Sequence, residues 1–359
     1  MPQQFKTIAP QLAKQLLDHY DLHGRDLPWR SERDLYRIWI SEIMLQQTGV
    51  QTVIPYYHAF LQRFPTVGQL AEAEQEAVLS QWQGLGYYRR ARMLHRAAQQ
   101  IIAQHGGGFP QELADVVALP GVGPSTAAAI LAIGRDQHHA ILDGNVIRVL
   151  SRLLALDEPV DGAAGKKTLW QLARLLTPAD RPGDYAQAIM DLGATLCSRQ
   201  KPDCPSCPWQ HHCVAASRNN PLAYPVKKSK KKSPQRYQCM WVLVDSAGRV
   251  ALRQRPEEGL LGGMWEPLGE PLRSTAPDES TLEIAQKALT RQGLHGGELV
   301  EKESVQHVFT HFRLTVYPIY REIHSHTTPL PEGRWFTPQE ITQLPISTLH
   351  RKVLKSALG

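Results

Sequence analysis

The sequence predicts an all-α N-terminal domain followed by a smaller α+β domain, on three observations. Apolar residues recur at helical spacing in most segments before about residue 215. After Pro225 the segments become shorter, β-branched and aromatic, which is typical of strands. Four of the five cysteines lie within residues 197–213, which indicates a metal-binding loop at the end of the helical part. With 359 residues, the chain is long enough for two domains that each have a core.

Gly, Pro and Asp divide the N-terminal part into segments, as expected at helix ends. Apolar positions three and four residues apart predict helices over 34–47, 76–85, 91–105, 111–119, 124–133, 145–156 and 183–196. We therefore expect a single helical domain over residues 1–225.

The C-terminal part combines strand and helix patterns. Strands are predicted over 237–245, 249–255, 306–320 and 334–338, and helices over 280–293 and 347–358. We expect this domain to cover residues 237–359, after a basic linker over 226–236.

The linker accounts for the net charge of the chain. Residues 226–236 contain six Lys or Arg residues and no acid, and the whole chain has a formal net charge of +6. Net charge alone therefore does not indicate a nucleic-acid partner, and a solvated linker is favoured over a phosphate contact. The N-terminus lacks the apolar core of a signal peptide, and no stretch approaches a membrane span, so we expect no membrane partner.

Residues Leu119–Ile130 read LPGVGPSTAAAI, the pattern of a tight turn between two helices. Gly121 and Gly123 can adopt positive φ and let another backbone approach closely. Pro124 suits the first turn of the second helix, where its missing N–H costs nothing. The free N–H groups of that turn can bind a phosphate, although an ordinary turn in a helical core has the same pattern.

The cysteine loop has the spacing C-x6-C-x2-C-x5-C, formed by Cys197, Cys204, Cys207 and Cys213. Four thiolates this close in sequence can meet at one centre without a distant ligand. Zinc ribbons usually use two separated C-x2-C pairs, whereas one compact loop is typical of cubane iron–sulfur clusters. The spacing favours one [4Fe-4S] cluster in a structural role, with zinc as the alternative.

Glu42 shares an apolar helical stripe with Leu35, Ile38 and Leu45. Desolvation raises the pKa of a carboxyl group on such a stripe, so that it can donate a proton near neutral pH. The alternative is a glutamate that turns outward or pairs with Arg37.

Asp143 lies between an apolar run and a predicted helix, where Asp is a favoured N-cap. The N–H groups of the helix start can also hold its carboxylate ionised. An acid such as Glu42 and a counter-charge such as Asp143 are what cleavage of a glycosidic bond requires.

The hairpin, Asp143 and the cysteine loop occur in an order and at a scale that resemble the endonuclease III superfamily of helix-hairpin-helix DNA glycosylases. Within it, SEIMLQQT, GLGYYRRAR, LPGVGPSTAAAI and LDGNVIRVL are similar to the MutY family of adenine DNA glycosylases, over nearly all of residues 5–225. The resemblance implies a two-lobed helical domain with its hairpin at about 111–134. It also implies an enzyme that flips adenine out of a mispair with 8-oxoguanine or guanine in double-stranded DNA and hydrolyses its N-glycosidic bond.

The resemblance implies roles for individual residues. Glu42 protonates adenine, Asp143 stabilises the sugar cation, and Asn145 orients Asp143 or the sugar. An amide such as that of Gln187 suits the adenine edge, because it both donates and accepts. Further substrate contacts are implied for Gln47 and Tyr87, which intrude into the duplex, and for Leu45, Ser125 and Arg30. Phosphate contacts are expected at Gly121 and Gly123. They are also expected along the run Arg89, Arg90, Arg92 and Arg96, which contains no acid and for which a solvated helix face is the alternative.

Ser125 stands where bifunctional relatives carry the lysine that attacks the sugar. A serine without an adjacent base is a poor nucleophile. We therefore expect a monofunctional glycosylase that uses water.

The segment RVALRQRPEEGLLGGMWEPLGE resembles the opening of a Nudix (MutT-like) fold. The helix over 280–293 offers Glu283 but lacks the REXXEE array that holds magnesium, so we expect the fold without hydrolase chemistry. In the family a Phe-Ser-His turn detects 8-oxoguanine. Here the turn is Phe309-Thr310-His311, in which threonine keeps the hydroxyl.

Two other functions fit parts of the sequence. An endonuclease III-type glycosylase and lyase for damaged pyrimidines is disfavoured by Ser125 and by the C-terminal domain. A lesion-binding protein without catalysis is disfavoured by Glu42 on its apolar stripe. We expect a monomer, located in the cytoplasm with the nucleoid if the protein is bacterial.

Overall fold

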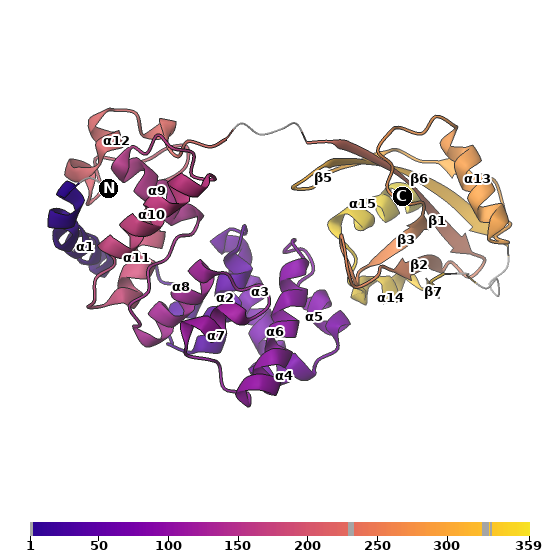
Figure 1. Cartoon of the computed structure of the whole chain (residues 1–359). Coiled ribbons are helices and arrows are strands. Elements are labelled where there is room, and N and C mark those ends of the chain that lie inside the picture. The colour runs from indigo at the N-terminus through magenta and orange to yellow at the C-terminus, as the bar shows by residue number, and fades with distance from the viewer. Residues whose placement is uncertain (1–2, 229–232, 325–329, 331) are drawn as a thin grey trace. The chain divides into compact units, whose positions relative to one another are not determined.

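The computed structural model describes residues 3–228, 233–324, 330 and 332–359 (Figure 1). Residues 229–232 of the expected linker lie outside this part. The chain forms two compact units: Met1–Glu72 with Arg96–Lys230, and Ala73–His95 with Lys231–Gly359. The second unit thus includes residues 73–95, which the sequence assigns to the helical domain, because this segment makes hydrogen bonds to the C-terminal part.

The first unit is helical, as predicted. Its helices are α1 (Gln3–His23), α2 (Leu35–Leu45), α3 (Val50–Arg63), α4 (Val67–Glu72), most of α6 (Arg89–His105), α7 (Leu113–Ala118), α8 (Pro124–Arg135), α9 (Gly144–Leu154), α10 (Ala163–Leu176), α11 (Pro182–Ala194) and α12 (Val214–Ser217), with 3₁₀ turns at Pro28–Arg30, Gln210–His212 and Pro221–Ala223.

Helix α8 packs against both α2 and α11. Its interior is built from small residues, including the buried Ala127, Ala128 and Ala129. Close packing also depends on Gly183 in α11, because a Cβ atom there would lie 2.4 Å from the carbonyl oxygen of Ala132. Small residues at these contacts bring α2, the start of α9 and α11 around one cavity.

The second unit contains α5 (Gln75–Gln81), the first residues of α6, and a seven-stranded mixed sheet. The strands are β1 (Gln235–Asp245), β2 (Val250–Gln254), β3 (Trp265–Gly269), β4 (Val300–Glu301), β5 (Val305–Val308), β6 (Arg313–Ile323) and β7 (Arg334–Phe336). Their order is β4-β6-β1-β3-β2-β7, and β5 pairs with β6. The long strands β1 and β6 run parallel, from Gln235 opposite Arg313 to Asp245 opposite Ile323.

Helices cover both faces of this sheet (Figure 1). Met240 and Val242 of β1 pack with α15 (Thr348–Leu358), near α14 (Pro338–Gln343). The alternate residues Cys239 and Trp241 pack with α13 (Thr281–Arg291). Because successive side chains of a strand point to opposite faces, the continuous apolar run in β1 reflects burial on both sides.

Candidate active site

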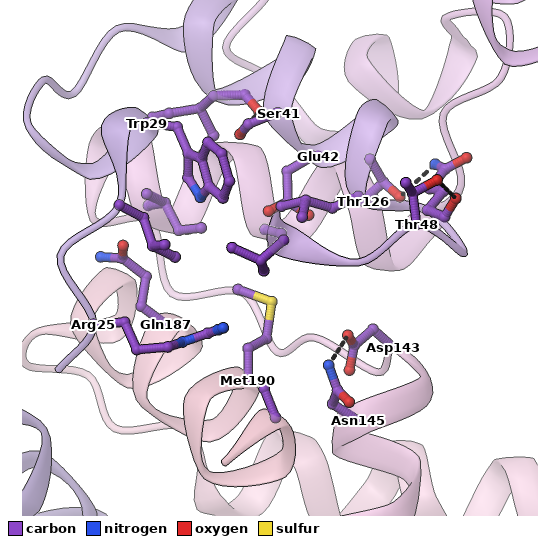
Figure 2. Close-up of a pocket in the computed structure, with 18 of the residues that line it drawn as sticks. Arg25, Trp29, Ser41, Glu42, Thr48, Thr126, Asp143, Asn145, Gln187 and Met190 are labelled. Carbon is purple, nitrogen blue, oxygen red and sulfur yellow. Dashed lines mark hydrogen bonds between the residues drawn. The ribbon is translucent and has the colours of Figure 1, made fainter. Parts of the chain in front are cut away.

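A cavity of about 1130 Å³ in the first unit holds the predicted catalytic residues (Figure 2). It is enclosed by α2, the start of α8, the start of α9 and α11. Eight of the predicted site residues line it: Arg30, Glu42, Leu45, Gln47, Ser125, Asp143, Asn145 and Gln187. Residues more than a hundred positions apart therefore meet in one place.

Glu42 extends from α2 into this cavity (Figure 2). Burial, and then the charge of Asp143, raise the pKa of Glu42 to about 7, while the charge of Arg30 opposes the increase. Arg37 pairs instead with Glu32, at 3.5 Å between the guanidinium and the carboxylate. The geometry therefore supports the prediction that Glu42 carries a proton near neutral pH.

Asp143 is the N-cap of α9, as its position before a helix predicts. Its Oδ1 accepts a hydrogen bond from the Val146 N–H at 2.7 Å, and its Oδ2 lies 3.4 Å from the Asn145 Nδ2 donor. Burial raises the pKa of Asp143, whereas these donors and the charge of Arg148 lower it. Burial outweighs these interactions and raises the pKa of Asp143 overall, an effect that opposes the ionised form expected from the sequence.

Asn145 is itself held in place by Arg148. The Arg148 Nη2 donates to the Asn145 Oδ1 at 2.9 Å, and its Nε donates to the Cys197 carbonyl oxygen at 2.8 Å. Gly193 of α11 packs so closely that a Cβ atom would lie 2.6 Å from the Asn145 Cβ. A continuous set of polar contacts therefore joins the first cysteine of the loop to Asp143.

Arg25 and Arg30 on the cavity wall bind the buried Asp191, a group that was not predicted from the sequence. Arg30 binds Asp191 through two hydrogen bonds, of 2.7 and 2.8 Å, and the Arg25 Nε donates to the same carboxylate at 2.8 Å. Burial raises the pKa of Asp191, but the bonds from Arg30 and Arg25 outweigh it and lower the pKa overall. Arg30 therefore has a buried partner as well as its place beside Glu42. A signal was present in the sequence, since Asp191 lies one helical turn after Gln187 on the same face.

Ser125 lines the cavity, and its hydroxyl accepts a hydrogen bond from the Leu142 N–H at 2.8 Å. Among the described residues, no basic side chain hydrogen-bonds to this hydroxyl. Ser125 thus fixes the chain directly before Asp143, a role that the sequence did not indicate.

The predicted hairpin is formed by α7 and α8, and one of its two glycines behaves as expected. Gly121 has a φ of +79°, in the region that favours glycine. Gly123 instead has an extended backbone with a φ of −94°, so the expected positive φ is wrong at this position. Gly123 is the N-cap of α8 and provides no capping side chain, which leaves the first N–H groups of the helix available to an anion.

The predicted arginine contacts differ in exposure. Arg89 is exposed, whereas Arg90 is buried and its Nη2 donates to the Gly86 carbonyl oxygen at 3.1 Å. Burial lowers the pKa of Arg90 to about 10. Arg92 is also buried, and it donates to the carbonyl oxygens of Gly259 and Gly262. A surface phosphate contact is therefore easier to assign to Arg89 than to Arg90 or Arg92.

The four predicted metal ligands line one narrow cavity, together with the buried Arg152. The Arg152 Nη1 lies 3.3 Å from the Cys197 Sγ, so it can donate to a thiolate. Burial raises the pKa of the Cys207 thiol to about 12, a cost that a bound metal centre removes. The donor set fits a cluster, although no three His, Cys, Asp or Glu side chains of the described residues already have the geometry of a metal site.

The predicted lesion-reading turn joins β5 to β6 in the second unit. Thr310 and His311 are exposed, and the Phe309 N–H donates to the Phe312 carbonyl oxygen at 2.9 Å. Phe309 is half-buried against Phe312, with 4.8 Å between the ring centres. The tip thus presents a hydroxyl and an imidazole, while the phenyl ring belongs partly to the core.

Comparison with known proteins finds a family match in the helical part and in the C-terminal part of the chain. Residues 40–174 match the model of the HhH-GPD superfamily of base excision DNA repair proteins, and residues 239–356 match the NUDIX domain. No helix in the described part of the chain is long and apolar enough to cross a membrane.

Curated relatives with similar sequences carry the name adenine DNA glycosylase. The protein from Rattus norvegicus is 34% identical over 98% of this chain and 79% of its own length. The protein from Homo sapiens is 35% identical over 99% of this chain and 76% of its own length. The protein from Arabidopsis thaliana is 37% identical, and the match spans 55% of its length.

Solved structures show the same helical fold. A thermostable thymine-DNA glycosylase matches with a TM-score of 0.55 and 27% identity, over 59% of this chain and 98% of its own. An endonuclease III–DNA complex matches with a TM-score of 0.52 and 19% identity, over 61% of this chain and 99% of its own. The predicted fold class is confirmed for both parts of the chain.

Proposed function

Because the chain belongs to the adenine DNA glycosylase family, we propose that it removes adenine mispaired with 8-oxoguanine, or with guanine, from double-stranded DNA. The observation that carries the proposal is the shared cavity of Glu42 and Asp143, in which burial gives Glu42 a pKa of about 7. At neutral pH a large share of Glu42 is then a neutral acid.

The two carboxyl groups have different roles in the proposed reaction. Neutral Glu42 donates its proton to a ring nitrogen of the flipped adenine, and the bond between the base and C1′ breaks with its electron pair on the departing base. Carboxylate Asp143 stabilises the resulting sugar cation. Water then adds to C1′, and its proton passes to the Glu42 carboxylate, which restores the acid.

Two other residues of the cavity, and Tyr87 of the second unit, serve recognition in this proposal. Gln187 hydrogen-bonds to the adenine edge, and Gln47 enters the duplex beside the vacated position. Gln47 has a φ of +59°, which is unusual for a non-glycine residue and holds the side chain at an exposed turn. Tyr87, with a φ of +49°, has the same feature and the same proposed role.

The presence of Ser125 at this position supports a reaction in which no amine of the enzyme forms a covalent bond to the sugar. Its hydroxyl already accepts the Leu142 N–H, and this position provides no amine that could attack the sugar. We propose that the enzyme leaves an abasic site and does not cut the strand efficiently.

The cysteine loop, in our proposal, holds one [4Fe-4S] cluster through Cys197, Cys204, Cys207 and Cys213. The cluster would supply a fixed scaffold for the loop, which contacts Arg148 and Arg152. Zinc is the alternative occupant.

Recognition of the opposite base is assigned to the β5–β6 turn. Thr310 can hydrogen-bond to the edge of 8-oxoguanine, and its exposure at the tip supports this role. We propose that the protein acts as a monomer on chromosomal DNA, in the nucleoid if it is bacterial. Sedimentation of the free protein and of its DNA complex tests the monomer.

The direct test is adenine release from duplexes in which adenine stands opposite 8-oxoguanine, guanine or thymine. We expect release from the first two duplexes and not from the third. Release should be lost in Glu42→Gln. Absence of adenine release from both mispairs contradicts the proposed function. Strand cleavage of an abasic duplex without added base, at the rate of a lyase, contradicts the proposed monofunctional reaction.

A further inference from the structure

Tyr87 lies in a segment that packs with the C-terminal domain. Residues 73–95 share a compact unit with residues 231–359, although more than 130 residues separate them in the chain. Tyr87 is 48% exposed within this segment. The contacts on either side of Tyr87 show how the segment is held.

Hydrogen bonds join the segment before Tyr87 to two parts of the C-terminal domain. The Trp265 Nε1 donates to the Glu76 Oε1 at 2.7 Å. The Gln83 Nε2 donates to the carbonyl oxygens of Leu344, at 3.3 Å, and Ile346, at 3.1 Å. Gln83 is four residues before Tyr87.

Hydrogen bonds from Arg92 join the segment after Tyr87 to a loop of the C-terminal domain. This side chain is 5% exposed, and its guanidinium donates to the carbonyl oxygens of Gly259 and Gly262. The same loop lies close to α5, because a Cβ atom on Gly263 would stand 3.1 Å from the Gln75 Nε2. The loop is therefore fitted against both helices that flank the Tyr87 turn.

The turn between these anchors has an uncommon backbone. The φ angles are +94° at Gly84, +77° at Gly86 and +49° at Tyr87. The Trp82 Nε1 donates to the Gly86 carbonyl oxygen at 3.2 Å, and the Arg90 guanidinium lies 5.5 Å from the Tyr87 ring centre. A backbone of this kind persists only when surrounding contacts hold it.

We propose that the C-terminal domain positions Tyr87 for entry into DNA, with Arg92 as the positioning residue. The domain would then act on substrate recognition in two ways, through its own β5–β6 turn and through the turn that carries Tyr87. This inference rests on the proposed role of Tyr87 in the duplex.

The first test measures hydrogen–deuterium exchange of the full chain without DNA. We expect Arg92→Ala to speed amide exchange in residues 84–90 at least tenfold. Arg321→Ala is the matched control, because Arg321 is also buried and also donates to carbonyl oxygens of a loop, those of Leu294, Gly296 and Gly297. It should leave exchange in residues 84–90 unchanged. No increase in Arg92→Ala, or an equal increase in Arg321→Ala, overturns the proposal.

A milder variant covers the case in which Arg92→Ala does not fold. Trp265→Phe removes the indole N–H that reaches Glu76 and keeps an aromatic ring. It should also speed exchange in residues 84–90, and an unchanged profile in this variant overturns the proposal.

The second test is a double-mutant cycle on single-turnover adenine release. Arg92→Ala should slow release about tenfold in the wild-type background and much less when Tyr87→Ala is present, because both changes remove the same contact with DNA. Partial rescue by Arg92→Lys would agree with this role, and fully additive losses overturn it. If Tyr87→Ala alone leaves release unchanged, the proposed role of Tyr87 fails, while the exchange experiment still decides whether Arg92 positions the turn.

Discussion

Glu42 and Asp143 carry the same carboxyl group in different surroundings. Burial raises the pKa of both groups. Asp143 also receives hydrogen bonds from Val146 and Asn145, whereas the second largest influence on Glu42 is the charge of Asp143 itself. These surroundings support our proposal that Glu42 donates a proton and that Asp143 stabilises the sugar cation.

The role of Asp143 can be tested with Asp143→Asn. The amide keeps an oxygen that can cap α9 but removes the negative charge, so the fold and DNA binding should persist. Single-turnover adenine release should fall by a factor of about 10³, as expected when a preorganised charge is removed from a transition state. An unchanged rate would remove Asp143 from the mechanism.

The sequence pointed to these two residues for different reasons: Glu42 is a carboxyl group that interrupts an apolar stripe, and Asp143 is an aspartate at the expected start of a helix. It could not identify the partner set of Asp191. The two arginines that bind Asp191 lie more than 160 positions away, and only the tertiary fold brings them together. The Ser125 contact with Leu142 was missed for the same reason.

At the scale of elements, the hairpin depends on one glycine more than on the other. Gly121 requires a positive φ, whereas Gly123 has an extended backbone that any residue adopts. Gly121 is therefore needed for its backbone conformation. At Gly123 the absence of a side chain leaves the first N–H groups of α8 accessible.

Gly121→Ala should therefore lower the free energy of unfolding by about 1 kcal/mol, because alanine is strained at positive φ. Gly123→Ala is the matched control for stability, since no atom lies within 4 Å of the added Cβ. Thermal or denaturant unfolding of the two variants measures the difference. Equal destabilisation would show that the conformation of Gly121 is not the limiting feature.

Helices and strands whose apolar residues recur at a regular spacing could be predicted, and those without such a spacing could not. Helices α9, α13 and α15 lie where the apolar spacing placed them. Helix α3 was not predicted, because its sequence VQTVIPYYHAFLQR contains β-branched residues and an internal Pro55. Strands β3 and β4 are short, and they are defined by pairing with β1 and β6 rather than by their own sequence.

At the scale of the whole molecule, the division of the chain into units does not follow the linker alone. The change in composition after Pro225 predicts that a second domain starts near residue 237, and the NUDIX match covers residues 239–356. It does not indicate that residues 73–95 pack with this domain. Gln83 and Arg92 donate to backbone carbonyl oxygens, which every residue has, so no sequence pattern marks these contacts.

The cysteine loop yields a prediction for the intact protein. The purified chain should contain about four irons and four sulfides per molecule, and Cys207→Ser should reduce this content and destabilise the helical unit. Cys239→Ser is the matched control, because Cys239 is buried in β1 of the other unit. Elemental analysis and visible absorption measure the result. Stoichiometric zinc without iron would identify the alternative centre.

The most direct test of the account is the pH dependence of single-turnover adenine release from a duplex with adenine opposite 8-oxoguanine. Glu42 must be protonated to act, and its pKa is about 7, so the rate should be constant at lower pH and fall about tenfold per pH unit above this value. Glu42→Gln should lose both the activity and this pH dependence. A wild-type rate that stays constant up to pH of about 9, or a Glu42→Gln variant that releases adenine at the wild-type rate, would contradict a proton-donating Glu42.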